Sequence, residues 1–182
     1  LYGADAGGVV NITTLAPQDG FGGEVSAEGG RYGTQQFAGN VGGGNDTVDF
    51  NLSAADYKTD GFNARTDDDT LADDDGYDNT TAHGRFGWNA SDNLRLGLAV
   101  HDIDATNDYD ECFDADGERT DRCENDYKQQ ASRVQGDYEL GRFNHQLFYS
   151  ESDTDRNFYS DSASTFKPQG TLERSGYLGT FT

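Results

Sequence analysis

The chain has 182 residues, of which 34 are acidic and 13 basic, so its formal net charge is -21. Charge of this sign repels nucleic-acid phosphates, so we expect no nucleic-acid partner and an attraction for cations. No apolar run reaches the ~18 residues that a membrane-spanning helix needs, and we expect any export signal to have been removed already. The chain also lacks methionine, so we expect a processed piece or a fragment of a longer protein.

Alternation of apolar and polar residues with a period of two recurs along the chain and predicts strands rather than helices. The first such segments place these residues on one face: Val48, Phe50 and Leu52, then Phe86 and Trp88. The clearest segment follows, with Leu94, Leu96, Leu98 and Val100 on one face. A later segment aligns Phe143, His145, Leu147 and Tyr149, although Phe148 interrupts its polar face. The predicted class is all-β.

The connections between these segments are of two kinds. Tight turns are predicted at GGGND (42–46), NASDN (89–93) and ELGRF (139–143). Long acidic loops near 58–79, 106–126 and 153–170 separate them. About eight antiparallel strands after residue 22, with short turns at one end and long loops at the other, are typical of a transmembrane β-barrel.

The predicted strands have about 9 to 13 residues, close to the ~9 to 11 that cross a bilayer at a tilt. Aromatic residues near their ends, Tyr57, Phe62, Tyr127 and Phe143, are candidates for the girdles at the two membrane interfaces. A soluble β-sandwich is the alternative, but it does not explain why short and long connections alternate.

The most acidic stretch, NDYDECFDADGERTDRC (107–123), raises the question of a calcium site. An EF-hand loop needs an oxygen ligand at position 1 and a glutamate at position 12 around a central glycine. Alignment on Gly117 puts Cys112 and Cys123 at those positions, and the stretch TLADDDGYDNTT fails the same test. The stretch GGGNDTVDF (42–50) is similar to the calcium-binding nonapeptide of repeats-in-toxin proteins, but that fold needs tandem copies. A hairpin turn entering a strand is the better interpretation.

Cys112 and Cys123 are the two cysteines, and no histidine lies near enough in sequence to suggest a zinc site. We expect a disulfide, which would remove roughly 3 kcal/mol of chain entropy from the unfolded state and persists only in an oxidising compartment. Two free thiols in a reduced protein are the alternative.

The first residues, LYGADAGGVVNITT, resemble the end of the plug domain of TonB-dependent outer-membrane receptors, where a similar pattern leads into the barrel. One residue is missing between Ala6 and the glycine pair Gly7 and Gly8. The resemblance implies that residues 1–20 are the last plug strand and a linker. Residues 21–182 would then be the N-terminal part of a barrel of about 22 strands in the outer membrane of a Gram-negative bacterium, in contact with outer-membrane lipid.

Several later stretches are similar to the cobalamin (vitamin B12) receptors of that family: GGEVSAEGGRYGTQQFAGNVGGG, DGFNAR, DDDGYDNTT and NLRLGLAVHDIDATNDYDE. In that branch, acidic extracellular loops bind calcium and become ordered for substrate capture. The resemblance implies calcium as a cofactor, cobalamin as the ligand and the TonB complex as the energy source. The implied calcium ligands are Asp108, Asp110, Asp114, Asp116, Asp153, Asp155 and Asp161.

Three other functions remain open at this point. A ferric-siderophore receptor is the nearest, although an acidic mouth suits a neutral or cationic ligand better than an anionic chelate. A complete small barrel with a structural or adhesive role is the second, because eight strands can close. An enzyme is not expected, because His83, His101 and His145 occur singly and no nucleophile elbow accompanies them.

Overall fold

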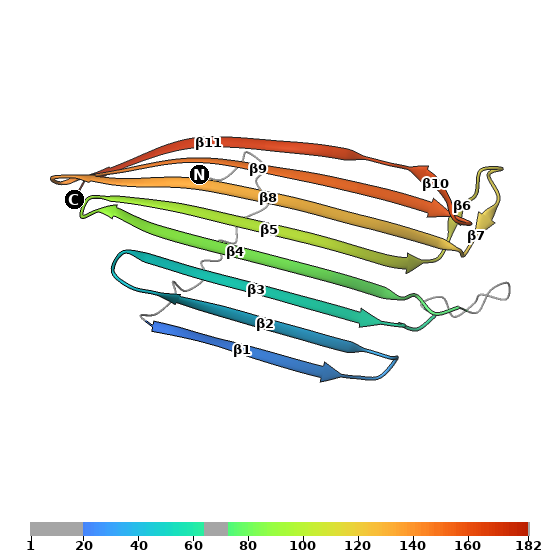
Figure 1. The fold of residues 1–182 in the computed structure, drawn as a ribbon. Coiled ribbons are helices and arrows are strands. Elements are labelled where there is room, and N and C mark those ends of the chain that lie inside the picture. Colours follow the sequence, from blue (N-terminus) through green and yellow to red (C-terminus); the bar gives the residue numbers. More distant parts are fainter. Residues whose placement is uncertain (1–19, 64–72, 182) are drawn as a thin grey trace.

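The computed structural model describes residues 20–63 and 73–181, which form one antiparallel sheet with its strands in chain order (Figure 1). Its eight long strands are β1 (Gly20–Gly29), β2 (Gln35–Gly44), β3 (Val48–Thr59), β4 (Tyr77–Ser91), β5 (Leu94–Tyr109), β8 (Cys123–Leu140), β9 (Phe143–Ser160) and β11 (Gln169–Phe181). The short β10 (Ala163–Phe166) pairs with the end of β9, and β6 (Cys112–Phe113) pairs with β7 (Arg119–Thr120) as a separate hairpin. The prediction of an all-β, antiparallel chain is confirmed.

The tight turns lie together at one end of the sheet, on the left in Figure 1. They join β2 to β3, β4 to β5 and β8 to β9 through residues 45–47, 92–93 and 141–142. The last of them needs a left-handed backbone at Gly141 (φ 62°), which glycine adopts without steric cost. At the opposite end, β1 is joined to β2, β3 to β4 and β5 to β8 by longer connections, as predicted, whereas β9 turns into β10 through residues 161–162. We call these two ends the turn end and the loop end.

The strands extend further toward the loop end than the sequence predicted. β8 and β9 each have 18 residues, or roughly 60 Å at the usual rise of a strand. The predicted loop at 106–126 shrinks to the residues between Tyr109 and Cys123, and the one at 153–170 was wrong, because β9, β10 and β11 occupy most of it. The sequence did not reveal this because residues near the loop end are polar on both faces, whereas backbone pairing keeps them extended.

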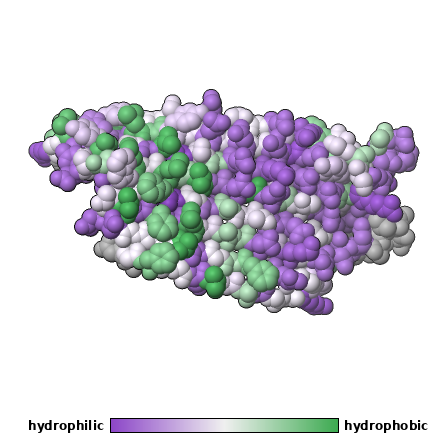
Figure 2. All heavy atoms as spheres, in the orientation of Figure 1, coloured by the Kyte–Doolittle hydropathy of each residue, from purple (hydrophilic) through white to green (hydrophobic). Residues whose placement is uncertain are grey.

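The two faces of the sheet differ in composition. On one face, here called the Leu98 face, neighbouring strands place large apolar side chains side by side over the turn end. We call these residues the apolar band: Phe21, Val41, Val48, Phe50, Leu52, Phe86, Trp88, Leu94, Leu96, Leu98, Val100, Val134, Tyr138, Phe143, Leu147, Tyr149, Tyr177 and Phe181. Toward the loop end the same face becomes polar, and Figure 2 shows the apolar and hydrophilic side chains separated in this way along the sheet. The opposite side is the Arg133 face.

Nothing in the described part of the chain covers the apolar band. Leu147 and Val134 expose 62% and 50% of their surface, and Ala105 and Cys123 are the only buried hydrophobic residues among those described. The sheet is also open along both edges, because β1 pairs only with β2 and β11 only with β9. The described residues therefore form a single layer without a core.

No helix long and apolar enough to cross a bilayer occurs in residues 20–63 or 73–181. The segment 1–19, which carries the plug-like motif, lies outside the described residues. Of the four predicted girdle residues, Phe143 borders the apolar band at the turn end, where its ring lies 4.9 Å from that of Phe181. Tyr57 and Tyr127 instead point to the Arg133 face near the loop end, and Phe62 follows β3 with its ring 5.5 Å from Tyr32.

Candidate functional site

Acidic side chains from three separate segments meet at the loop end. Asp108 at the end of β5 lies opposite Glu124 at the start of β8, and Glu124 lies opposite Tyr159 on β9. These strands and the residues before β4 and β8 enclose a cavity of about 490 Å³. Its lining comprises Asp73, Asp74, Asp108, Asp121, Arg122, Cys123, Glu124, Tyr159 and Ser162. We call this the acidic cavity.

The acidic cavity disfavours ionisation of two of its carboxyl groups, Asp108 and Glu124. Partial burial raises the pKa of Asp108, Asp75 and Asp73 raise it further through charge repulsion, and a backbone hydrogen bond from Gly76 acts in the opposite direction. Burial likewise raises the pKa of Glu124, with repulsion from Asp126 and Asp108 adding to it. Both shifts arise at the loop end, outside the apolar band. A cation in the cavity would relieve this repulsion.

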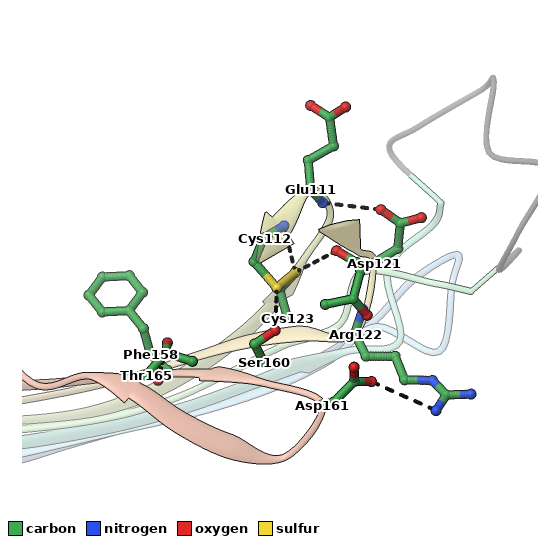
Figure 3. The surroundings of a disulfide bond; sticks show 10 residues. Glu111, Cys112, Asp121, Arg122, Cys123, Phe158, Ser160, Asp161 and Thr165 are labelled. Atoms are coloured by element: carbon green, nitrogen blue, oxygen red, sulfur yellow. Dashed lines mark hydrogen bonds and ion pairs between the residues drawn. A yellow bond between two sulfur atoms is a disulfide. The ribbon is translucent and has the colours of Figure 1, made fainter. Parts of the chain in front are cut away.

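A disulfide fixes one wall of the cavity (Figure 3). Cys112 and Cys123 are bonded, with their Cα atoms 5.9 Å apart, so the predicted bridge is confirmed. Ser160, almost fully buried, donates its hydroxyl to Cys112 Sγ at 3.2 Å and thereby ties the hairpin to β9. The Asp161 amide donates to the Arg122 carbonyl oxygen at 3.0 Å, and the Arg122 guanidinium lies 3.8 Å from the Asp161 carboxylate.

One of the predicted calcium ligands, Asp114, has a local structural role at the tip of the β6–β7 hairpin. Asp114 Oδ1 accepts hydrogen bonds from the backbone amides of Asp116 and Glu118, both at 2.9 Å. Gly117 completes the turn with a φ of 83°. This arrangement is an Asx-type turn, so the aspartate at this position is explained by backbone geometry.

The remaining predicted ligands are spread along the sheet. Asp153 accepts a hydrogen bond from Thr171 at 2.6 Å, and Asp155 lies opposite Lys128 on β8. Glu124, the partner of Asp108, lies four residues from Lys128 on β8. Asp155 and Asp108 are therefore roughly 13 Å apart along the strand direction. Asp161 occupies the turn after β9, and Asp110 follows β5 at the base of the hairpin.

Of the seven predicted ligands, only Asp108 lines the acidic cavity. Among the described residues, no group of three or more carboxylate, histidine or cysteine side chains is close enough to hold a metal ion. The seven aspartates therefore do not form one site. The cavity does supply carboxylate oxygens, the ligands that calcium prefers, so calcium stays a prediction with a changed set of candidate residues.

Sequence reasoning missed four residues of the cavity: Asp73, Asp74, Asp121 and Glu124. Asp73 and Asp74 belong to the run DDDG that ends at Gly76, and the resemblance to cobalamin receptors included this run without assigning it a role. Its connection to the site is a backbone hydrogen bond, from the Asp108 amide to the Gly76 carbonyl oxygen at 3.0 Å. A pairing between segments 32 residues apart cannot be read from local sequence pattern.

No known protein family and no curated protein matches this sequence in the comparisons.

Proposed function

We propose that this chain is part of the wall of a TonB-dependent outer-membrane receptor that takes up cobalamin. One observation carries the membrane part of the proposal: a single-layer sheet with an exposed apolar band at its turn end and a polar loop end. In water such a sheet would expose about eighteen apolar side chains with no second layer to bury them. In a barrel wall, lipid would cover the band and further strands would pair with β1 and β11.

The dimensions agree with this arrangement. On β9 the apolar band runs from Phe143 to Tyr149, after which Glu151, Asp153 and Asp155 occupy the same face. Seven residues of a strand span roughly 23 Å along the strand, or about 16 to 19 Å of membrane thickness at the usual tilt of about 35–45°, which is the greater part of the ~25 Å apolar belt of outer-membrane barrels. The polar remainder of β8 and β9 would project beyond the bilayer and carry the acidic cavity on the extracellular side.

The acidic loop end supports the choice of ligand. The carboxylates that line the acidic cavity repel one another. A divalent cation held by Asp108, Glu124 and their neighbours would neutralise part of this negative charge. A loop end neutralised in this way suits a neutral ligand such as cobalamin. Together with the resemblance, this supports cobalamin bound by calcium-ordered loops and imported with energy from the TonB complex.

The test is calorimetric titration of cyanocobalamin into the intact, detergent-solubilised receptor, first with calcium and then with a chelator. We expect tight binding that weakens at least tenfold without calcium. The variant Asp108→Asn should lose most of this calcium dependence. The control Asp46→Asn removes the same charge at the turn end and should behave as the wild type. Absence of cobalamin binding under both conditions would contradict the ligand assignment.

A further inference from the structure

Positive charge is concentrated on the face of the sheet opposite to the apolar band. The side chains of five arginines point to the Arg133 face: Arg85, Arg95, Arg133, Arg156 and Arg174. The carboxylates Asp102, Asp104, Glu151, Asp153, Asp155 and Glu173 all point to the Leu98 face. On the Arg133 face of β3 to β11, these five arginines outnumber the carboxylates Asp49, Asp137 and Glu139.

Three of these arginines lie in one row across the strands. Arg85 on β4 pairs with Ala99, which pairs with Arg133 on β8. Arg133 in turn pairs with Ser150, which pairs with Arg174 on β11. Strands lie about 4.8 Å apart, so consecutive arginines of the row are roughly 10 Å apart with a small residue between them.

The other two arginines of this face lie outside the row. Arg95 forms an ion pair with Asp49, and Arg156 lies over the ring of Tyr127 at 4.8 Å. In the described residues, by contrast, no carboxylate lies within ion-pairing distance of Arg85, Arg133 or Arg174.

Among the described residues, the partners of Arg133 are neutral. Its guanidinium donates to Gln135 Oε1 at 2.8 Å and lies 4.0 Å over the ring of Phe148. These contacts fix the direction of the guanidinium but do not compensate its charge. Its remaining N–H groups, which lie in one plane like the prongs of a fork, can donate hydrogen bonds to a ligand.

A cavity of about 300 Å³ lies beside the row. The side chains that line it on the Arg133 face are hydrogen-bond donors or small and apolar: His83, Ala99, His101, Ala131, Arg133, Ser150, Ser152, Leu172 and Arg174. Glu151 also borders the cavity, but its carboxylate is on the Leu98 face, where it accepts a hydrogen bond from Tyr149 at 2.9 Å. Within residues 20–63 and 73–181, no carboxylate therefore competes for the guanidinium groups of Arg133 and Arg174.

We propose that this cavity binds a small oxyanion, a molecule that carries phosphate or carboxylate groups. Guanidinium forks match the oxygens of such groups in pairs, and charge-assisted hydrogen bonds of this kind are about twice as strong as neutral ones. Ser150 and Ser152 supply hydroxyl donors from the neighbouring strand, and Ala99 and Ala131 leave the space that the ligand occupies. The proposal does not rest on cobalamin uptake, because it concerns the other face and a ligand of different charge.

The test is calorimetric titration of inorganic pyrophosphate, and separately of citrate, into the intact detergent-solubilised protein at fixed ionic strength with a chelator present. We expect saturable binding of at least one of the two probes. Arg174→Gln should weaken it roughly tenfold or more, because one charge-assisted contact is lost. Arg133→Lys, which keeps the charge but removes the fork, should weaken binding to a smaller extent.

Lys167→Gln is the matched control, since it removes one positive charge from the connection between β10 and β11 and Lys167 does not line the cavity. It should bind the probe as the wild type does. Arg174 is exposed, so the main variant preserves the fold. The proposal is overturned if the wild type binds neither probe, if Arg174→Gln binds unchanged, or if Lys167→Gln loses as much affinity as Arg174→Gln.

Discussion

Asp108 and Glu124 show how single residues at the loop end destabilise the fold that contains them. The two carboxyl groups oppose each other across β5 and β8, and burial raises the pKa of each. A carboxyl group with a raised pKa in the folded state favours the fold when it is protonated. The contribution of these two groups to stability is therefore fully present below their ordinary pKa values and is lost as the pH rises through the raised ones.

Asp108→Asn should slow backbone hydrogen exchange in residues 73–76 and 108–124 at pH 7 when no divalent cation is present. The substitution removes one of the charges that repel each other, while the amide keeps the size of the side chain. Hydrogen exchange followed by mass spectrometry measures the effect, with Asp46→Asn as the control. Faster exchange in Asp108→Asn than in the control would contradict the account.

The sequence indicated where acidic residues concentrate but could not assign a role to each. Asp114 and Asp116 follow the spacing of calcium ligands, yet Asp114 holds backbone amides of its own turn. Asp153 and Asp155 are close to the other candidates in chain order, but the register of β8 and β9 separates them from Asp108. Which carboxylates face one another depends on strand pairing, which local composition does not determine.

The β6–β7 hairpin depends on one covalent link. Removing the disulfide by the double substitution Cys112→Ser and Cys123→Ser should destabilise residues 110–122, because a loop with a sequence separation of 11 regains about 3 kcal/mol of chain entropy. Limited proteolysis should then cut within this segment, whereas the tight turns stay resistant. Reducing the wild-type protein should reproduce the effect, and equal protease resistance with and without the disulfide would argue against it.

The apolar band should respond to charge as a surface in contact with lipid. Leu98→Lys places an ammonium group in the middle of the band. It should lower the free energy of unfolding in bilayers by roughly 2–4 kcal/mol. Gln130→Lys introduces the same group on the same face in the polar zone, beside Asp102, and should change stability little. Urea-induced unfolding in lipid vesicles measures both, and equal costs for the two variants would contradict a lipid-facing band.

At the level of elements, the sequence predicted more than it missed. The alternation at 94–100 and 143–149 fixed both the strands and the face that is apolar, and glycine-rich turns fixed the end at which strands reverse. The ends of β5, β8 and β9 were missed because side chains at the loop end are polar on both faces. Phe148, which interrupted the polar pattern, has a partner in Arg133 that only the register reveals.

Across the whole molecule, charge and hydropathy are distributed along two directions. From the turn end to the loop end, the Leu98 face changes from apolar to acidic. Five of the arginines in the strands point to the opposite face, together with a smaller number of carboxylates. A solvated surface in a protein with a net charge of -21 would not need this separation. A wall between lipid on one side and a polar interior on the other would account for the apolar part of this distribution.

The most direct test of this membrane-wall account is a spin-label scan of residues 94–102 on β5 in the intact protein, reconstituted in lipid vesicles. Oxygen partitions into the bilayer and a nickel chelate into water, so their collision rates with each label report its surroundings. The account predicts that labels at positions 96, 98 and 100 collide mainly with oxygen and labels at 95, 97 and 99 mainly with the nickel chelate. Equal access of the nickel chelate to all positions, without alternation, would contradict the central claim.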